Sequence, residues 1–435
     1  VTGGSDATLN NTNSVDNAVT VDITDATLNL ADIALFDHAL TGTGTLNVAK
    51  NDASTAFDFG SSVGGAFSGT VNLTNSTFAL NAGNTAALAN ATLQLSANNV
   101  TTVGTDDRTL HGLDLSGGTL IFDGAAPQSQ ASGVVTVTDL ALNSGTISVT
   151  GTDSWTNQNP VLAPNLSILD QDRGDIMLEL INAGTVSGAA SGLNLMINGT
   201  TVTDTAQGVV SAILQGGTTV ANATHNYGLT SSDGSGGNGL YVNYSLSALE
   251  LLTDGADALL LATDSSATSN KELNALVSGV GGLQVDATNG ALTLANGSNS
   301  YQGTTTVNAG ELILGANGAF GQTSLLDIAS GASANINGHT QTVGTLTNAG
   351  TVTLGSGGVL NSGVLSNSSI LDITGGMLNL SSGGVSTATG GLTGAGTLNI
   401  NGGDLAVSGA NSGLSGQTLI ASGASATLNG AGTLG

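Results

Sequence analysis

The feature that most constrains the fold of this chain is a short sequence motif, here called the word, that recurs along almost its whole length. Three to five residues alternate between aliphatic and small polar side chains, and Gly, Asn or Ser then closes the word. Copies include Ala26-Thr27-Leu28-Asn29-Leu30, Gly44-Thr45-Leu46-Asn47-Val48, Gly69-Thr70-Val71-Asn72-Leu73, Met377-Leu378-Asn379-Leu380 and Gly396-Thr397-Leu398-Asn399-Ile400. Alternation with a period of two is typical of a β-strand, so the sequence predicts many very short strands separated by turns.

Strands this short hide only one or two aliphatic side chains each, so local hairpins made of them would be unstable. Stacking removes the difficulty. If three strands form one coil and coils lie about 4.8 Å apart, the inward Leu, Val and Ile make a continuous core. A repeat of roughly 20–25 residues then predicts about 18 coils. The words of a leucine-rich repeat and of a calcium-bound β-roll are missing, so the sequence predicts an all-β, right-handed parallel β-helix.

The composition of the chain excludes several classes of function. Among 435 residues there are only 4 Lys or Arg against 30 Asp or Glu, for a formal net charge of -26. So few cations cannot neutralise a run of phosphates, which excludes nucleic-acid binding driven by bulk electrostatics. The lack of Cys excludes a disulfide framework, zinc fingers and thiol nucleophiles, and no apolar run is long enough to enter a membrane.

The middle of the chain departs from the repeat. Longer apolar runs at residues 220–229 and 240–252 flank a stretch rich in Gly and Ser at 230–239, which predicts a small antiparallel hairpin module. We therefore divide the chain into an N-terminal β-helix at 1–166, a β-helix with the inserted hairpin at 167–265, and a C-terminal β-helix at 266–435.

One short helix is predicted where the C-terminal β-helix begins. Ser269 and Glu272 match the S-x-x-E capping box, and the apolar residues that follow recur at helical spacing before Gly281-Gly282. These apolar residues are Leu273, Leu276, Val277 and Val280.

Residues 299–321, which begin Asn299-Ser300-Tyr301-Gln302-Gly303, resemble the passenger repeat of bacterial type V autotransporters, N-x-Y-x-G-x-T-x-V-x-x-G-x-L-x-L-G. Residues 238–244 and 249–252 resemble a stretch recurrent in adhesins of the AIDA-I type. The two matches cover residues from about 225 to 321. The N-terminal half resembles the family only in composition and in its Thr-Leu-Asn rhythm.

The resemblance implies the passenger (α) domain of an autotransporter adhesin. Such a domain is secreted through a C-terminal β-barrel, absent from this chain, and displayed on the surface of a Gram-negative bacterium. It implies cell–cell aggregation, biofilm formation and attachment to host surfaces. The expected partners are another copy on a neighbouring cell and a host surface glycan or matrix protein. We expect no nucleic-acid partner, no membrane insertion by this segment and no cofactor.

Parallel β-helices also include polysaccharide hydrolases and lyases, and the best acid/base candidate here is Asp106-Asp107-Arg108 with His111. Adjacent Asp side chains on a strand point to opposite faces, and such pairs often mark a turn, so the sequence favours a structural role. Asp233-Gly234-Ser235-Gly236 is near a serine-protease loop but lacks His and Asp partners. The chain is therefore predicted not to be an enzyme.

Binding candidates are few. His38, His111, His225 and His339 never pair at metal-ligand spacing. A calcium site at Asp170, Asp172 and Asp175 is less favoured than a solvated acidic turn, because the loop spacing of a calcium site is missing. Arg173-Gly174-Asp175 is a string known from integrin ligands, and the alternative is a surface salt bridge to Asp170 or Asp172.

The outward Asn residues are the most general feature. Equivalent side chains on successive coils lie about 4.8 Å apart, so Asn29, Asn47 and Asn72 are predicted to form a ladder. Such a ladder can simply satisfy the surface, or it can serve as a flat self-association face. We expect a surface adhesin that acts through this polar face. The alternative is a β-helical passenger that binds, or less readily cleaves, a glycan or binds the extracellular matrix.

Overall fold

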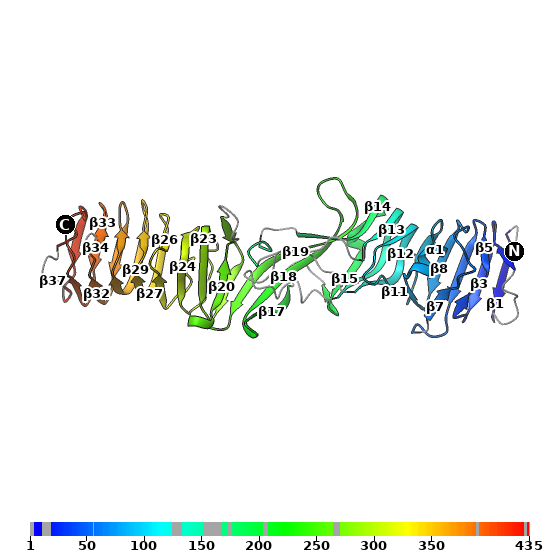
Figure 1. Ribbon diagram of the computed structural model, residues 1–435, viewed down its shortest axis with the longest axis horizontal. Coiled ribbons are helices and arrows are strands. Elements are labelled where there is room, and N and C mark those ends of the chain that lie inside the picture. The colour runs from blue at the N-terminus through cyan, green and yellow to red at the C-terminus, as the bar shows by residue number, and fades with distance from the viewer. Residues whose placement is uncertain are drawn as a thin grey trace. The chain divides into compact units, whose positions relative to one another are not determined.

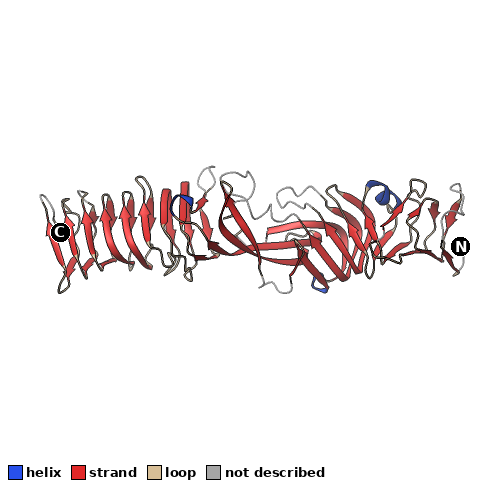
Figure 2. Ribbon diagram, turned by 90° about the horizontal axis from the view of Figure 1, so that it is seen from below, coloured by secondary structure: helices blue, strands red, loops and turns tan. Residues whose placement is uncertain are grey.

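The computed structural model describes residues 4–10, 19–54, 56–123, 133–150, 168–172, 176–202, 208–263, 270–388, 391–429 and 433–434. These residues are almost entirely β, and most strands pair in parallel with the equivalent strand of the neighbouring coil (Figure 1, Figure 2). The fold is a parallel β-solenoid of about 18 turns, which confirms the predicted fold class.

The chain divides into two compact units. Unit 1 comprises Val1–Trp155, Asp175–Val209 and Asn226–Tyr244, and unit 2 comprises Thr156–Gly174, Val210–His225 and Ser245–Gly435. The three-part division made from the sequence stays a prediction.

The first coils of unit 1 stack the repeated word on itself. Leu28 pairs with Leu46, Leu46 with Val71, and Val71 with Leu93, and all four side chains are at most 2% exposed. Residues between them face outward, because successive side chains of a strand alternate. The elements here are β1 (Asp6–Leu9), β2 (Thr20–Asp22), β3 (Thr27–Ala31), β4 (Leu35–Phe36), β5 (Ala39–Thr41), β6 (Thr45–Ala49), β7 (Ala56–Phe59), β8 (Thr70–Thr74), β9 (Thr77–Ala79), α1 (Ala82–Ala87), β10 (Thr92–Leu95) and β11 (Val100–Thr102).

Longer strands complete unit 1, because the chain there stays extended through a corner of the coil. Gly117 and Gly145 lie at such corners with positive φ, and the register between β12 and β13 shifts beside them. The elements are β12 (Arg108–Phe122), β13 (Val135–Val149), β14 (Ile176–Gly188), η2 (Ala190–Gly192), β15 (Leu193–Ile197) and β16 (Thr200–Val202).

Two long arms form the predicted hairpin. The backbone oxygen of Val220 accepts a hydrogen bond from Leu252 N at 2.9 Å, and the Tyr227 ring stacks on Tyr244 with centroids 5.6 Å apart. Val220 thus lies beside Leu252, and Tyr227, later in the chain, lies beside Tyr244, which comes earlier than Leu252. The two arms therefore run antiparallel, which confirms the predicted hairpin module. The arms are β18 (Thr218–Ser232) and β19 (Asn238–Leu251), preceded by β17 (Val209–Gln215).

The predicted helix at 269–280 is wrong. Lys271–Leu273 (β21) and Leu276–Gly279 (β22) are strands, and Ser269 lies outside the described residues. β21 pairs with β23 and β22 pairs with β19, so neighbouring coils supply the backbone hydrogen bonds that a helix would have made internally. Strand alternation also decides burial within β22: Val277 is fully buried, whereas its neighbours Leu276 and Ser278 are half-buried. Tertiary pairing has overridden a local helix signal.

Unit 2 continues the solenoid with strands of 2 to 12 residues. Its described elements are η3 (Gly255–Asp257), β20 (Leu259–Ala262), β23 (Leu283–Leu294), β24 (Thr305–Leu314), β25 (Leu325–Ile328), β26 (Ser333–Asn335), β27 (Thr340–Asn348), β28 (Thr351–Thr353), β29 (Val359–Asn367), β30 (Ile370–Asp372), β31 (Met377–Leu380), β32 (Gly383–Ser386), β33 (Leu392–Thr393), β34 (Thr397–Ile400), β35 (Asp404–Val407), β36 (Gln417–Ile420) and β37 (Ser425–Leu428).

The passenger-like repeat has a structural role in this unit. The Tyr301 ring is fully buried, and its hydroxyl lies 2.8 Å from Thr305 Oγ1, which lies 2.7 Å from Thr323 Oγ1. Gly310 has a φ of 72°, and a Cβ there would approach the backbone oxygen of Ala287 to 1.9 Å, so only glycine fits. The repeat therefore encodes a tight corner and a buried hydroxyl chain.

Candidate functional site

The predicted asparagine ladder of unit 1 is present. Asn47 Nδ2 donates to Asn29 Oδ1 at 2.9 Å, and Asn72 Nδ2 donates to Asn47 Oδ1 at 3.2 Å. Ser96 Oγ donates to Asn72 Oδ1 at 2.6 Å and ends the chain of bonds. Strand register places the three asparagines in one column, so their geometry follows directly from stacking the repeated word. The residue in register after Asn72 is Gln94, whose Nε2 donates to Asp114, so Ser96 reaches Asn72 from outside the column.

A second ladder lies in unit 2. Asn399 Nδ2 donates to Asn379 Oδ1 and Asn379 Nδ2 donates to Asn361 Oδ1, both at 2.7 Å. Asn361 Nδ2 donates in turn to Thr342 Oγ1 at 3.2 Å. The Asn379 and Asn399 words were visible in the sequence, but their partner Asn361 lies in the less regular word Leu360-Asn361-Ser362.

The ladders use only part of the hydrogen-bonding capacity of their surface. An amide has two N–H donors, and each rung uses one of them within the ladder. Beside the unit 1 ladder, a column of threonines points outward; in the described part of the chain, no group pairs with the hydroxyls of Thr27, Thr45 or Thr70. The groups open to a partner are therefore these hydroxyls and the second amide N–H of the rungs.

The strands that carry each ladder have no charged outward residue. We call the outward surface of β3, β6, β8 and β10 the unit 1 ladder face, and that of β31, β34, β36 and the first halves of β27 and β29 the unit 2 ladder face. None of their outward residues is Asp, Glu, Lys or Arg. The other two faces of unit 2 carry Asp327 and Asp404, and Glu311 and Asp372. In unit 2 the acidic residues are thus segregated from the ladder. In unit 1 the ladder face is bordered by Asp6, in register with Thr27, and by Asp114, in register with Gln94.

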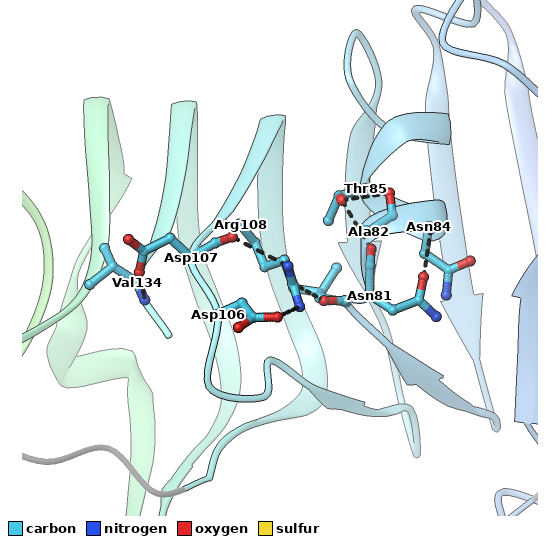
Figure 3. A network of polar contacts seen from close by, with 9 residues as sticks. Asn81, Ala82, Asn84, Thr85, Asp106, Asp107, Arg108 and Val134 are labelled. Atoms are coloured by element: carbon cyan, nitrogen blue, oxygen red, sulfur yellow. Dashed lines mark hydrogen bonds and ion pairs between the residues drawn. The ribbon is translucent and has the colours of Figure 1, made fainter. Parts of the chain in front are cut away.

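The acid/base candidate is built into the fold (Figure 3). Arg108 reaches the Asp106 carboxylate at 2.9 Å, and its Nε donates to the backbone oxygen of Leu80. Asp107 instead accepts the backbone N–H of Val134 at 3.1 Å. The two carboxylates therefore make separate structural contacts. His111 Nε2 lies 4.0 Å from Asp139, away from both of them.

The same region explains why α1 forms between β9 and β10. The side chain of Asn81 caps the helix by accepting the N–H of Asn84 at 2.8 Å (Figure 3). Buried Asn84 accepts the N–H of Phe59 and donates to Asp58, so the helix is tied to the coil beneath it.

Of the acidic turn at 170–175, the structure describes Asp170 and Asp172. Asp170 forms an ion pair with Lys271, and the buried Asp172 carboxylate accepts the backbone N–H groups of Asn274 and Ala275. Burial raises the pKa of Asp172 above its ordinary value. These side chains tie residues 168–172 to the coil at 271–275. Arg173, Gly174 and Asp175 lie outside the described residues, so the integrin hypothesis stays a prediction.

No metal site emerges from the residues that are described: no group of three or more His, Cys, Asp or Glu side chains gathers to hold an ion. The Asp233 carboxylate closes the hairpin tip by accepting the N–H groups of Ser235 and Gly237, as a turn residue does. His225 Nε2 lies 2.7 Å from Gln171 Oε1, and burial lowers the pKa of this histidine to about 4.

The structure also contains a column of buried amide side chains that the sequence did not predict. Asn348 Nδ2 donates to Asn367 Oδ1 at 2.8 Å, and Asn367 Nδ2 donates to Ser386 Oγ at 3.2 Å, with all three side chains buried at one corner of the coil. The signal was an Asn that ends a Leu-Thr-Asn or Leu-Ser-Asn word just before a turn. These Asn side chains form hydrogen bonds with the backbone of the corner. A turn motif in the sequence does not show whether its Asn side chain will make such bonds.

Two curated relatives match most of this chain. It is 33% identical over 394 residues to the uncharacterized lipoprotein YdeK of Escherichia coli K12, a match that covers 83% of the chain and 29% of that protein. It is 32% identical over 350 residues to the uncharacterized protein YuaQ of the same organism, covering 79% and 24%. The chain spans less than a third of the length of these relatives.

No family model matches the chain, and no solved structure matches it. In the described residues, the longest helices fall short of the length and apolar character needed to cross a bilayer.

Proposed function

We propose that this chain is part of a bacterial surface adhesin whose ladder faces pair with those of another copy on a neighbouring cell. The observation that carries the proposal is that the ladder strands of each unit have no charged outward residue, in a chain of net charge -26. Two copies repel each other wherever acidic faces meet, and the ladder faces are where that repulsion is least.

The strength of such a contact comes from repetition. A hydrogen bond exchanged with water has a net worth of about 1 kcal/mol, so no single rung can hold two copies together. Identical coils repeat the same donors and acceptors at the strand spacing of about 4.8 Å, which lets two faces match along their length. We expect an isolated pair to be weak and cells that bear many copies to clump firmly.

The proposed location is the cell surface. The resemblance of residues 299–321 to the autotransporter passenger repeat supports it, and so does the name of one relative, a lipoprotein. Lipoproteins are anchored to membranes by acyl chains, so the relative's name is consistent with a place in the cell envelope.

Salt provides the first test. If polar bonds act against like-charge repulsion, cells that display the full-length protein should settle equally fast or faster as salt rises to about 0.15 M, where charges are screened beyond about 8 Å. Loss of clumping at moderate salt would mean that ion pairs hold the contact, and the proposal would fail.

A matched pair of double variants provides the second test. Thr45→Arg with Thr70→Arg places bulky charge on the unit 1 ladder face, in a column whose hydroxyls have no partner within the described chain. Thr77→Arg with Thr102→Arg places the same charge on half-buried outward positions of β9 and β11. The first pair should abolish clumping and the second should preserve it. Equal clumping by both would refute a ladder-face contact.

We also propose that the chain is not an enzyme. Asp106 and Asp107 make separate structural contacts, so these two carboxylates do not converge on one point as an acid and a base. Assays on a panel of polysaccharides should detect no hydrolase or lyase turnover. Turnover that disappears in Asp106→Asn or Asp107→Asn would overturn this part of the proposal.

Host binding through Arg173-Gly174-Asp175 remains a separate hypothesis. Asp175→Glu keeps the charge but lengthens the side chain, so it should weaken integrin-dependent attachment if the tripeptide is recognised. Unchanged attachment of cells that display this variant would remove the hypothesis.

A further inference from the structure

A shallow groove crosses the face of unit 2 formed by β24, β26, β28 and β30, which is not its ladder face. Five hydroxyl side chains and one carboxylate line it: Ser330, Ser333, Thr351, Thr353, Ser369 and Glu311. In register, Glu311 lies beside Ser333, Ser333 beside Thr351, and Thr351 beside Ile370, so the groove crosses several coils.

Small residues at the corner keep this groove open. Its floor contains Gly331, Ala332, Ala349 and Gly350. A Cβ on Gly350 would approach the backbone oxygen of Ala332 to 2.2 Å, so the chain passes too closely there for any side chain. Larger residues cannot fill the floor at this position without moving the backbone.

The buried amide column holds the groove in shape. Asn348 Oδ1 accepts the N–H of Gly350 at 3.1 Å, while Asn348 Nδ2 donates to the backbone oxygen of Ile370 at 2.8 Å and to Asn367. One fully buried side chain thereby fixes the floor of the groove and its far border. A ligand would find this backbone already ordered, which lowers the entropy cost of binding.

The polar groups of the groove are largely unused. Within the described residues, the hydroxyls of Ser330, Thr351, Thr353 and Ser369 have no hydrogen-bond partner. One oxygen of Glu311 receives Asn335 Nδ2 at 3.3 Å, which leaves the other for a ligand. Each hydroxyl can donate one hydrogen bond and accept others, so the groove offers both roles over a short span.

We propose that this groove binds a neutral glycan. Sugar hydroxyls also donate and accept, so they complement a row of Ser and Thr, and Glu311 can accept from a sugar hydroxyl. The lining holds no Lys, Arg or His, and the chain carries a net charge of -26, so an anionic polysaccharide would be repelled. At the border, the 48% exposed Ile370 offers an apolar contact for the C–H groups of a sugar ring.

The lining of the groove contains no aromatic side chain on which a sugar ring could stack, so we expect weak glycan binding. Hydrogen bonds to an exposed groove are each of modest net worth, so we expect dissociation constants of about 1 mM for a single oligosaccharide. Many copies on one cell would raise the avidity for a polymer. This site is independent of the ladder faces, so either proposal can fail alone.

Saturation-transfer NMR on the purified chain can test the groove. The probes are neutral oligosaccharides based on glucose, galactose, mannose and N-acetylglucosamine, with oligogalacturonate as the anionic comparison. Thr351→Trp should fill the groove from an outward strand position, and Thr347→Trp makes the same change on the neighbouring face. Glu311→Gln keeps the shape of the side chain and removes its charge.

We expect at least one neutral probe to bind, Thr347→Trp to bind as well as the parent, and Thr351→Trp to bind about tenfold more weakly because several modest bonds are lost. No response to any neutral probe at 10 mM or so would overturn the proposal, since the affinity expected from such bonds would give a signal. So would stronger binding of oligogalacturonate, or unchanged binding by Thr351→Trp. A gain of oligogalacturonate binding in Glu311→Gln would support the charge argument.

Discussion

The two asparagine ladders are built from the same word but end differently. In unit 1 the ladder closes on Ser96, whose hydroxyl donates to Asn72. In unit 2 the residue in register after Asn399 is Leu419, which has no donor, and Asn399 Oδ1 is a buried acceptor without a partner in the described chain. The difference teaches that an amide ladder leaves one unmet group at its end unless a different side chain terminates it.

The largest expected effect is a difference in acid stability between the ladder strands and the hairpin. The described ladder residues do not titrate, whereas the pKa of buried His225 on β18 is lowered from 6.5 to about 4. The unfolded chain therefore takes up a proton that the folded chain refuses, and stability falls as the pH drops from about 6.5 to about 4. The loss is on the order of 3 kcal/mol.

Hydrogen exchange corrected for intrinsic rates should show β18 losing protection in acid while β3, β6, β31 and β34 keep theirs. His225→Leu should flatten the response of β18. Asp172, with its raised pKa, acts in the opposite direction, so stability gained from its protonation should remain in this variant. Equal acid lability in the ladder strands would break the distinction.

Removing the middle of a ladder should have the next largest effect. Asn379→Leu leaves Asn361 Oδ1 without its donor and Asn399 Nδ2 without its acceptor, so we expect a loss of about 2 kcal/mol from two unmet polar groups. Exchange protection of β29 and β34, measured with the parent alongside, checks this. A change within error would mean that water satisfies both groups.

Removing the end of a ladder should cost less. Asn399→Leu breaks one bond but also removes an acceptor that already lacks a partner, so the loss should be about 1 kcal/mol or below. The same exchange experiment compares it with Asn379→Leu. If the two substitutions cost the same, the position in the ladder would not matter.

The smallest expected effect is a gain in stability. Leu419→Asn would place a donor in register with Asn399 Oδ1 and extend the unit 2 ladder by one rung, for about 0.5–1 kcal/mol. Leu419 is 48% exposed, so little apolar burial is lost. A rise of protection in β34 and β36 is expected, and Leu419→Ser serves as a shorter control. A loss of protection in Leu419→Asn would contradict the terminal-acceptor interpretation.

The sequence predicted the solenoid and the unit 1 ladder because both follow from one local rule, alternation within a word such as Thr27-Leu28-Asn29-Leu30. It could not predict that Lys271–Leu273 and Leu276–Gly279 would be strands, since the partners that decide this, β23 and β19, are set by coil stacking. The groove was equally hidden. Its floor depends on how Gly350 passes Ala332, a contact between coils rather than within a word.

The unit 2 ladder also has a direction. From Asn399 to Asn379 to Asn361 to Thr342, each side-chain amide donates its ladder hydrogen bond to the coil that comes earlier in the chain. A coil that folds onto an existing stack thus brings its own donor to an acceptor already in place. The column behaves as a polar template with one growing end, so folding that proceeds from the N-terminal side would meet a prepared acceptor at each step. Folding from the C-terminal side would instead present an unmet donor.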